Sequence, residues 1–271
     1  MSDANATTPR VFIARHGETE WTISGQCTGN ADIPLTENGE KQSKGTGEKL
    51  VGRGKLIDPA KLAHVFCSPR QRAIKTLDLL LGEDAKGTLE SEKKLSITDD
   101  ITEWDYGIYG PWFPCISWNR GRADMRSQKR ASPQPKSRLS EPTRICLSGT
   151  FGLWDVREES EHPFDHSRCA RGTLLIQRLR SPIQVQDRVD RLISNIKKIQ
   201  KPFMHGGPAP DVLIVAHGHI LRAFTKRWLE WDMGFPFTMM MEPGAIGVLS
   251  YAHHNIAEPA VLVGMAFPTT G

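Results

Sequence analysis

The chain has 271 residues, of which 38% are hydrophobic and 24% are charged, and its formal net charge is +4 at pH 7. This length fits one large α/β domain or two small ones, and the composition is ordinary for a globular protein. The small positive charge argues against nucleic-acid binding and suits an anionic small substrate.

Other global features bear on the cellular compartment. No apolar run approaches the roughly 18 residues that a membrane-spanning helix needs, so we expect no membrane association. The N-terminus lacks the basic and apolar blocks of a signal peptide. Five cysteines, an odd number scattered along the chain, favour a reducing compartment over a disulfide framework. The cytoplasm is the expected compartment, with the nucleus as an alternative.

The first apolar run, residues 11–14, ends in Arg15, His16 and Gly17. Such a run, bounded by a glycine, predicts a strand that is buried on both faces. Its exit lies at the rim of the sheet, where α/β folds keep their ligands. Taken alone, Arg15-His16-Gly17 fits equally well a polar end of the strand that has no functional role. After a loop without periodicity, Thr36 is a good N-cap and predicts a glycine-rich helix over residues 37–51.

The second apolar run, residues 64–67, is followed by helix start and stop signals. Ser68 suits the N-cap, proline follows it, and Gly82 lies past the predicted end of the helix. Arg70 would then lie in the first helical turn, whose free N–H groups favour an anion. Arg72 either solvates this helix or supports the same site. Residues 95–101 alternate and predict an edge strand, which leads into an acidic, aromatic turn.

Residues 108–182 differ from the rest of the chain. Residues 111–182 contain 13 Lys and Arg against 7 Asp and Glu, and no helical or strand period persists there. Long structureless insertions are uncommon in compact domains, so we interpret this segment as a poorly ordered insert. A basic docking segment is the functional alternative. A further hypothesis is that residues 110–180 are not native coding sequence, for example a retained intron, which sequencing the transcript would test.

Regular patterns resume near residue 184. Apolar residues at helical spacing predict a helix that stops at Pro202, with Asp187, Arg188, Lys197 and Lys198 facing outward. Residues 211–216 form the clearest buried strand and end in His217, after which a helix from Ile220 to about Trp231 presents Arg222 near its start. Two further strands are predicted, over residues 244–251 and within the last apolar stretch, residues 259–267.

Three predicted strands therefore end in cationic or imidazole side chains. If these strands are parallel, Arg15, His16, Arg70 and His217 converge on one pocket at the carboxyl edge of the sheet. Guanidinium groups match phosphate geometry, and one acid beside them, Glu103, suits proton transfer to a leaving oxygen. The histidines at 217, 219, 253 and 254 could instead bind a metal, but no acid lies at ligand spacing beside them. We expect no metal site and interpret His219 as structural.

The ordered set of these motifs resembles the histidine phosphatase, or phosphoglycerate-mutase-like, superfamily. Residues 10–107 and 183–267 carry the resemblance, and residues 108–182 do not. Within the family, the turn at 103–107 and the tail at 247–256 are similar to the fungal metal-independent sedoheptulose-1,7-bisphosphatase type. The motifs are Arg15-His16-Gly17-Glu18-Thr19, Ser68-Pro69-Arg70 with Arg72-Ala73 and Thr76, Glu103, and Ala216-His217-Gly218-His219.

The resemblance implies an α/β fold, a single three-layer α/β/α sandwich with an atypical insert in place of the cap. It implies that His16 attacks phosphorus to form a phosphohistidine and that Glu103 protonates the leaving alkoxide and later activates water. Arg15, Arg70 and His217 would hold the phosphate oxygens. The residues implied at the substrate end are Cys27, Thr28, Trp104, Asp105, Tyr106, Arg222 and His253, of which Arg222 and His253 would hold a far phosphate.

The activity so implied is metal- and cofactor-independent hydrolysis of a sugar bisphosphate, with sedoheptulose 1,7-bisphosphate as the leading substrate. A phosphoglycerate mutase and a broad-specificity phosphomonoesterase are alternatives within enzymes. A weakly active or inactive regulatory protein that uses its basic insert for docking is the alternative from another class. The expected partner is a phosphorylated small molecule, and a homo-oligomer is left open.

Overall fold

The computed structural model describes residues 8–105, 182–208 and 210–263. The expectations for Tyr106, for the insert and for the end of the last apolar stretch therefore lie outside the described residues. None of the helices within the described ranges has the length and apolar character to cross a membrane.

A six-stranded sheet forms the centre of the molecule, in the order β3-β2-β4-β1-β5-β6. Strands β1 to β4 are mutually parallel, whereas β5 runs antiparallel to both β1 and β6. The predicted edge strand, β3, does lie at one edge, but it is only three residues long. The bounds are β1 Val11–Arg15, β2 Leu62–Cys67, β3 Leu95–Ile97, β4 Asp211–Ala216, β5 Ile246–Tyr251 and β6 Pro259–Val261.

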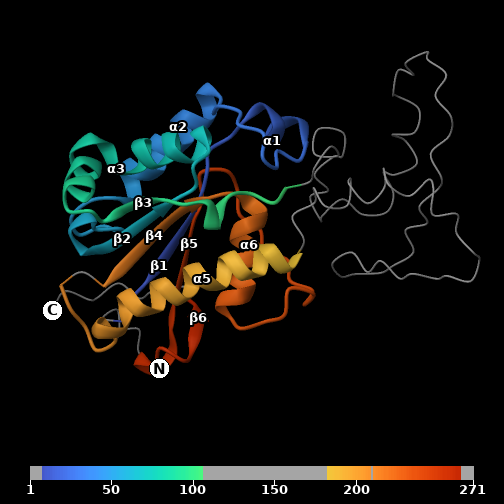
Figure 1. Cartoon of the computed structure of the whole chain (residues 1–271). Coiled ribbons are helices and arrows are strands. Elements are labelled where there is room, and N and C mark those ends of the chain that lie inside the picture. Colours follow the sequence, from blue (N-terminus) through green and yellow to red (C-terminus); the bar gives the residue numbers. More distant parts are fainter. Residues whose placement is uncertain (1–7, 106–181, 209, 264–271) are drawn as a thin grey trace, which may run out of the picture.

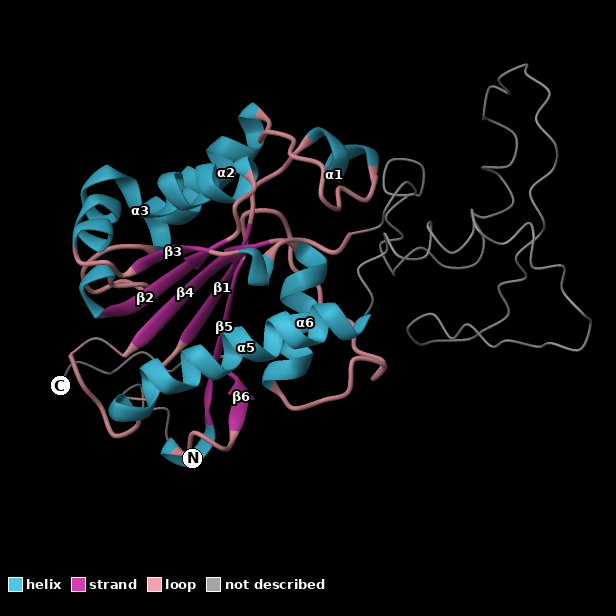
Figure 2. Ribbon diagram, viewed as in Figure 1, coloured by secondary structure: helices cyan, strands magenta, loops and turns pink. Residues whose placement is uncertain are grey.

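Helices cover both faces of this sheet (Figure 1). Helices α2 and α3 pack on one face, and α5 and α6 pack on the other (Figure 2), so the predicted three-layer α/β/α sandwich is confirmed. The α-helices are α1 Glu20–Ser24, α2 Glu37–Leu50, α3 Gln71–Ser91, α5 Pro182–Gln200 and α6 Gly218–Trp228, and the 3₁₀ helices are η2 Pro59–Lys61, η3 Asp99–Ile101, η7 Lys201–Phe203 and η8 Ala252–His254.

Strand alternation explains why two cores form. Successive side chains of a strand point to opposite faces, so Val11 and Ile13 of β1 enter the core beneath α5 and α6. Phe12 and Ala14 enter the core beneath α2 and α3. Because both sets are buried, the strand has to be apolar throughout, as the short unbroken run predicted.

Helix α3 differs from its prediction at both ends. It begins at Gln71, with Arg70 rather than Ser68 in the N-cap position, and the Gln71 N–H donates to Asp32 Oδ1 at 2.8 Å. The first N–H group of this helix is thus already bonded, which weakens the predicted anion site there. Gly82 does interrupt the helix, with φ of 74°, but a second helical segment continues to Ser91.

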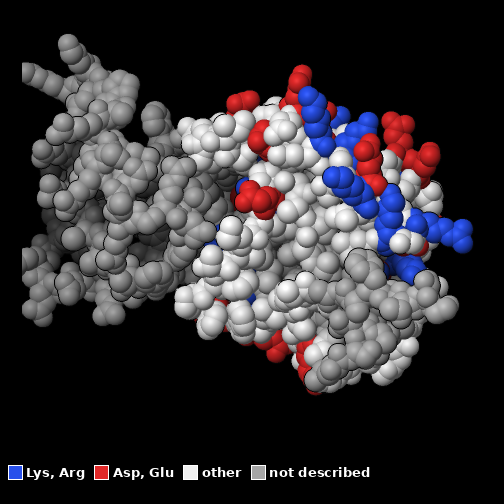
Figure 3. Space-filling model, turned by 180° about the vertical axis from the view of Figure 1, so that it is seen from behind, with Lys and Arg blue, Asp and Glu red and all other residues white. Residues whose placement is uncertain are grey.

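Surface charge is mixed in sign. Seen from behind, Lys and Arg side chains are interspersed with Asp and Glu along one side, and much of the described surface is uncharged (Figure 3). On this face an anion would therefore be attracted by local groups rather than by a broad positive patch.

Candidate active site

Three parallel strands end next to one another at the carboxyl edge of the sheet. Arg15 is in register with Ala216, and Cys67 is in register with Val215. The backbone continues this pairing one residue further, because the His16 N–H donates to the Ala216 carbonyl at 3.0 Å. The structure thus brings together the first residues after each strand, His16, Ser68 and His217.

His217 is held between a hydroxyl and a guanidinium. Its Nε2 lies 2.7 Å from Ser68 Oγ, and its Nδ1 accepts a hydrogen bond from Arg72 Nε at 3.1 Å. A guanidinium nitrogen can only donate, so Nδ1 must carry the lone pair and Nε2 the proton. This assigns a neutral imidazole whose Nε2–H points at Ser68. Burial and the positive charge of Arg72 hold the pKa of His217 well below its usual range.

His16 is the second buried imidazole, with its ring centroid 5.1 Å from that of His217. Its Nδ1 lies 2.7 Å from the Gly17 carbonyl, which can only accept, so Nδ1 carries the proton and Nε2 the lone pair. Burial, followed by the charge of Arg72, lowers the pKa of His16 to about 3. At neutral pH the ring is therefore neutral, with a defined orientation and its lone pair on Nε2.

Arg72, rather than Arg70, is the arginine that contacts His217. Its side chain is fully buried, and its other nitrogens donate to the Ala31 and Gly29 carbonyls at 2.6 and 3.2 Å. Burial lowers the pKa of Arg72 to about 10, so the guanidinium stays charged at neutral pH. The interpretation of Arg72 as a solvating residue of its helix is wrong.

Arg70 lies at the rim of the same cluster. Its NH2 group donates to Asn30 Oδ1 at 3.0 Å, and its buried Nε has no hydrogen-bond partner among the described residues. Cys27 and Thr28 are half-buried and directly precede Gly29, whose carbonyl accepts from Arg72. The loop that contains these two predicted substrate residues is therefore tied to the start of α3.

Two further guanidiniums are held by the loop that joins α6 to β5. Arg15 donates to the Met241 carbonyl at 2.6 Å, and Arg222 donates to the Met239 carbonyl at 3.2 Å. A Cβ atom on Gly218 would lie 3.4 Å from the Arg15 guanidinium carbon, which places Arg15 against the start of α6.

The exit of β1 also requires a glycine. A Cβ atom on Gly17 would lie 2.4 Å from the Gly39 carbonyl oxygen and 2.6 Å from Ser43 Oγ, so no side chain fits there. The Gly17 N–H donates to Thr76 Oγ1 at 3.1 Å. The Glu18 carboxylate accepts from Thr36 and Asn38 at the start of α2.

Glu103 lies at the amino end of α6, next to His217. Only 5% of the residue is exposed. Its Oε1 accepts from the Ile220 N–H at 3.0 Å, and its Oε2 accepts from the His219 N–H at 3.2 Å. This carboxyl is also one of the charges that act on Arg72. Trp104 packs against the core beneath α5 and α6, and the half-buried Asp105 is the last residue described before the insert.

His253 does not belong to this cluster, so its prediction as a pocket residue is wrong. Strand β5 is antiparallel to β1, with Val11 opposite Leu249 and Ala14 opposite Ile246. The carboxyl end of β5 therefore lies at the amino end of β1, across the sheet from His16. His254, next in the chain, has its Nδ1 3.3 Å from the Thr8 hydroxyl, which lies before the start of β1.

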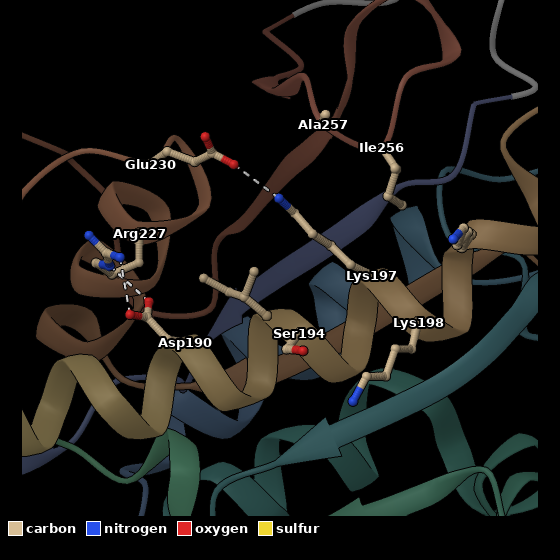
Figure 4. A pocket seen from close by; sticks show the side chains of 10 residues that line it. Asp190, Ser194, Lys197, Lys198, Arg227, Glu230, Ile256 and Ala257 are labelled. Carbon is tan, nitrogen blue, oxygen red and sulfur yellow. Dashed lines mark hydrogen bonds and ion pairs between the residues drawn. The ribbon is translucent and has the colours of Figure 1, made fainter.

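A shallow groove of about 690 Å³ lies elsewhere, between α5, the end of α6 and Ile256 (Figure 4). Two ion pairs cross it, Arg227 with Asp190 at 2.8 Å and Lys197 with Glu230 at 3.2 Å. None of the strand-exit residues lines this groove. Within the described ranges, no group of three or more His, Cys, Asp or Glu residues is placed to hold a metal ion.

Comparison with known proteins identifies the class. The model of the histidine phosphatase superfamily (branch 1) matches residues 11–144 and 145–260. The chain therefore belongs to this superfamily, whose members are phosphomonoesterases and mutases. The matched ranges include residues 108–182. The motifs had placed these residues outside the resemblance, so that expected boundary is wrong.

Individual relatives refine this assignment. The chain is 30% identical to sedoheptulose 1,7-bisphosphatase of Saccharomyces cerevisiae, over 94% of this chain and 92% of that protein. It is 28% identical to an acid phosphatase of Mycobacterium tuberculosis, over 93% and 91%. A solved structure, the mycobacterial glucosyl-3-phosphoglycerate phosphatase, shares the fold with a TM-score of 0.57 and 17% identity, over 93% of this chain and 95% of that chain.

Proposed function

We propose that the protein hydrolyses a sugar bisphosphate through a phosphohistidine at His16, without a metal. The observation that carries the proposal is an unprotonated His16 Nε2 beside His217, surrounded by the guanidiniums of Arg15, Arg70 and Arg72. A neutral nucleophile amid fixed positive charge suits attack on a phosphate monoester, whose transition state carries negative charge on its oxygens.

The first step forms a bond between His16 Nε2 and phosphorus while the bond from phosphorus to the sugar oxygen breaks. The electron pair of that bond goes to the sugar oxygen, and Glu103 in its acid form supplies the proton. In the second step water attacks the phosphohistidine, Glu103 takes a proton from it, and inorganic phosphate leaves. The arginines stabilise the phosphoryl oxygens in both steps, and His217 joins them by exchanging its Nε2–H hydrogen bond to Ser68 for one to a phosphoryl oxygen.

The choice of a bisphosphate rests on Arg222 and on the yeast relative. Arg222 lies about one helical turn after His217 on α6, and its buried Nε has no hydrogen-bond partner among the described residues. A guanidinium at this distance suits a second phosphate group. The yeast relative is named for sedoheptulose 1,7-bisphosphate, which supports this sugar as the first substrate to test.

The test measures phosphate release from sedoheptulose 1,7-bisphosphate and fructose 1,6-bisphosphate in the presence of EDTA. We expect release by the wild type, a loss of at least about 10³-fold for His16→Ala, and a retained rate for the control variant His254→Gln. Transfer of phosphate to an acceptor in place of release would indicate a mutase. No turnover by folded protein would contradict the proposal and favour a binding role, for which residues 111–182 would have to retain a specific partner.

A further inference from the structure

Arg188 is buried although the sequence predicted that it faces outward. Only 5% of the residue is exposed. Val185, three residues earlier, and Leu192, four residues later, are both buried on the inner face of α5. Arg188 therefore lies on the apolar stripe of this helix, where a charged side chain is costly unless it is hydrogen-bonded.

Three of its hydrogen bonds reach the turn that ends in Glu103. The NH1 group donates to Thr102 Oγ1 at 2.6 Å and to the Asp99 carbonyl at 2.9 Å, and NH2 lies 3.5 Å from the Glu103 carbonyl. Thr102 is itself fully buried and donates back to the Asp99 carbonyl at 2.9 Å. One side chain of α5 thus contacts two backbone carbonyls and one side-chain hydroxyl in the segment 99–103.

The segment that ends in Glu103 lies at one end of a long connection in the chain. Glu103 stands three residues before residues 106–181, and α5 begins immediately after them. Arg188 therefore joins the two ends of that long connection directly. Other contacts also hold this segment, because Ile101 is fully buried and the Glu103 carboxyl accepts from the His219 and Ile220 N–H groups, but Arg188 is the buried charge that reaches the Glu103 backbone from α5.

We infer that Arg188 is a positioning residue for Glu103: it holds the Thr102–Glu103 backbone so that the carboxyl stays aimed at the leaving oxygen. The inference rests on the proposed role of Glu103 in proton transfer. Proton donation requires hydrogen-bond distance, and a displacement of about 1 Å can cost about 10²-fold in rate. Arg188 acts through Glu103 and does not itself touch the substrate.

The test compares two substrates whose leaving groups differ in their need for a proton. Departure of a sugar alkoxide needs a proton, whereas p-nitrophenolate departs largely without one. We therefore compare kcat/KM, which reports phosphoryl transfer, for a sugar bisphosphate and for p-nitrophenyl phosphate. For Arg188→Gln we expect a loss of at least about 10-fold with the sugar and no more than about threefold with p-nitrophenyl phosphate, with Arg188→Lys in between.

Two variants make the result specific. Arg191→Gln is the matched control, because Arg191 comes from the same helix and pairs with Asp100 of the same turn at 2.8 Å, but its side chain is 63% exposed. It should leave both rates within twofold. Thr102→Val removes the acceptor of Arg188 at nearly constant volume and should reproduce the selective loss, which keeps the test decisive if Arg188→Gln folds poorly.

Equal losses with both substrates, or the same losses in Arg191→Gln, would overturn the inference and leave Arg188 a purely structural residue. Failure of the proposed function has a different outcome. In that case Glu103→Gln itself shows no leaving-group dependence, or His16→Ala retains the wild-type rates, and the inference falls with the function.

Discussion

The two ends of the sheet carry the same kinds of side chain, arginine and histidine, but surround them with different partners. At the amino end of β1, Arg10 forms a two-pronged pair with Asp211, with one N···O distance of 2.6 Å, and His253 Nδ1 lies 2.6 Å from Glu258. At the carboxyl end, Arg70 and Arg72 donate to backbone carbonyls, an amide oxygen and a ring nitrogen. Within the described residues, neither of these two arginines forms an ion pair.

The difference in partners distinguishes a structural role for the arginine at the amino end from a chemical role for those at the carboxyl end. A carboxylate neutralises a guanidinium and satisfies its donors, so the pair at the amino end stabilises the fold and has little left to attract an anion. A neutral carbonyl orients a guanidinium without cancelling its charge. The carboxyl end therefore holds positive charge in fixed positions, as stabilisation of a phosphoryl-transfer transition state requires.

Among the variants that follow from comparing the two ends of the sheet, we expect the largest effect on activity from a change at Arg72. Replacing it by methionine removes the charge nearest both histidines and the donor to His217 Nδ1. We expect kcat/KM for a sugar bisphosphate to fall by about 10³-fold, as when a fixed oxyanion donor is removed. Steady-state kinetics on folded protein measure it. A loss below tenfold would mean that Arg70 and Arg15 supply the charge without it.

The corresponding change at the other end, Arg10→Met, should affect stability in place of activity. Asp211 is only 1% exposed and would be left as a buried, unpaired carboxylate. We expect the free energy of unfolding to fall by about 3 kcal/mol, measured by urea denaturation, while kcat/KM stays within twofold below the transition. The double variant with Asp211→Asn should regain part of the lost stability. A large loss of activity in folded Arg10→Met would contradict the division between the two ends.

The two buried histidines also predict a pH dependence of stability. The pKa of His16 is about 3 in the folded state, below the ordinary value of 6.5, and that of His217 is lowered in the same direction. The unfolded chain therefore binds more protons below pH 6.5. Stability is unaffected by these groups above pH 6.5 and falls as the pH drops from there toward 3, by up to about 1.4 kcal/mol per pH unit for each histidine.

Urea denaturation between pH 7 and 5.5 tests this dependence in a range that largely avoids the carboxylates. In His16→Gln the slope should decrease by up to about 1.4 kcal/mol per pH unit relative to the wild type. An unchanged slope in His16→Gln would show that His16 titrates near its ordinary pKa in the folded protein.

Local sequence signals predicted much of the arrangement. The strands that exit into Arg15, Cys67 and His217 are short apolar runs, and their parallel pairing brings those exits together. These signals work because the carboxyl ends of parallel strands share one edge of the sheet, where α/β folds keep their ligands.

Buried charges were harder to predict, because tertiary partners decide their burial. Arg72 is fixed by carbonyls of Gly29 and Ala31, about 40 residues away, and Arg188 by Thr102, 86 residues away. A signal was nonetheless present in both cases. Arg72 precedes Ala73 and Thr76 on the buried face of α3, and Arg188 lies between Val185 and Leu192 on that of α5.

The position of His253 shows a different limit of prediction from sequence. Its replacement is also the change for which we expect the smallest effect. Alternation and apolarity mark β5 as a strand but do not give its direction, and an antiparallel strand carries its exit to the opposite end of the sheet. His253 is 59% exposed and bonded to Glu258, away from His16. We therefore expect His253→Gln to change kcat/KM for either sugar bisphosphate by less than twofold. If KM for the bisphosphates rose tenfold while the rate with p-nitrophenyl phosphate held, His253 would have to reach the far phosphate of a bound substrate, and the functional separation of the two ends would fail.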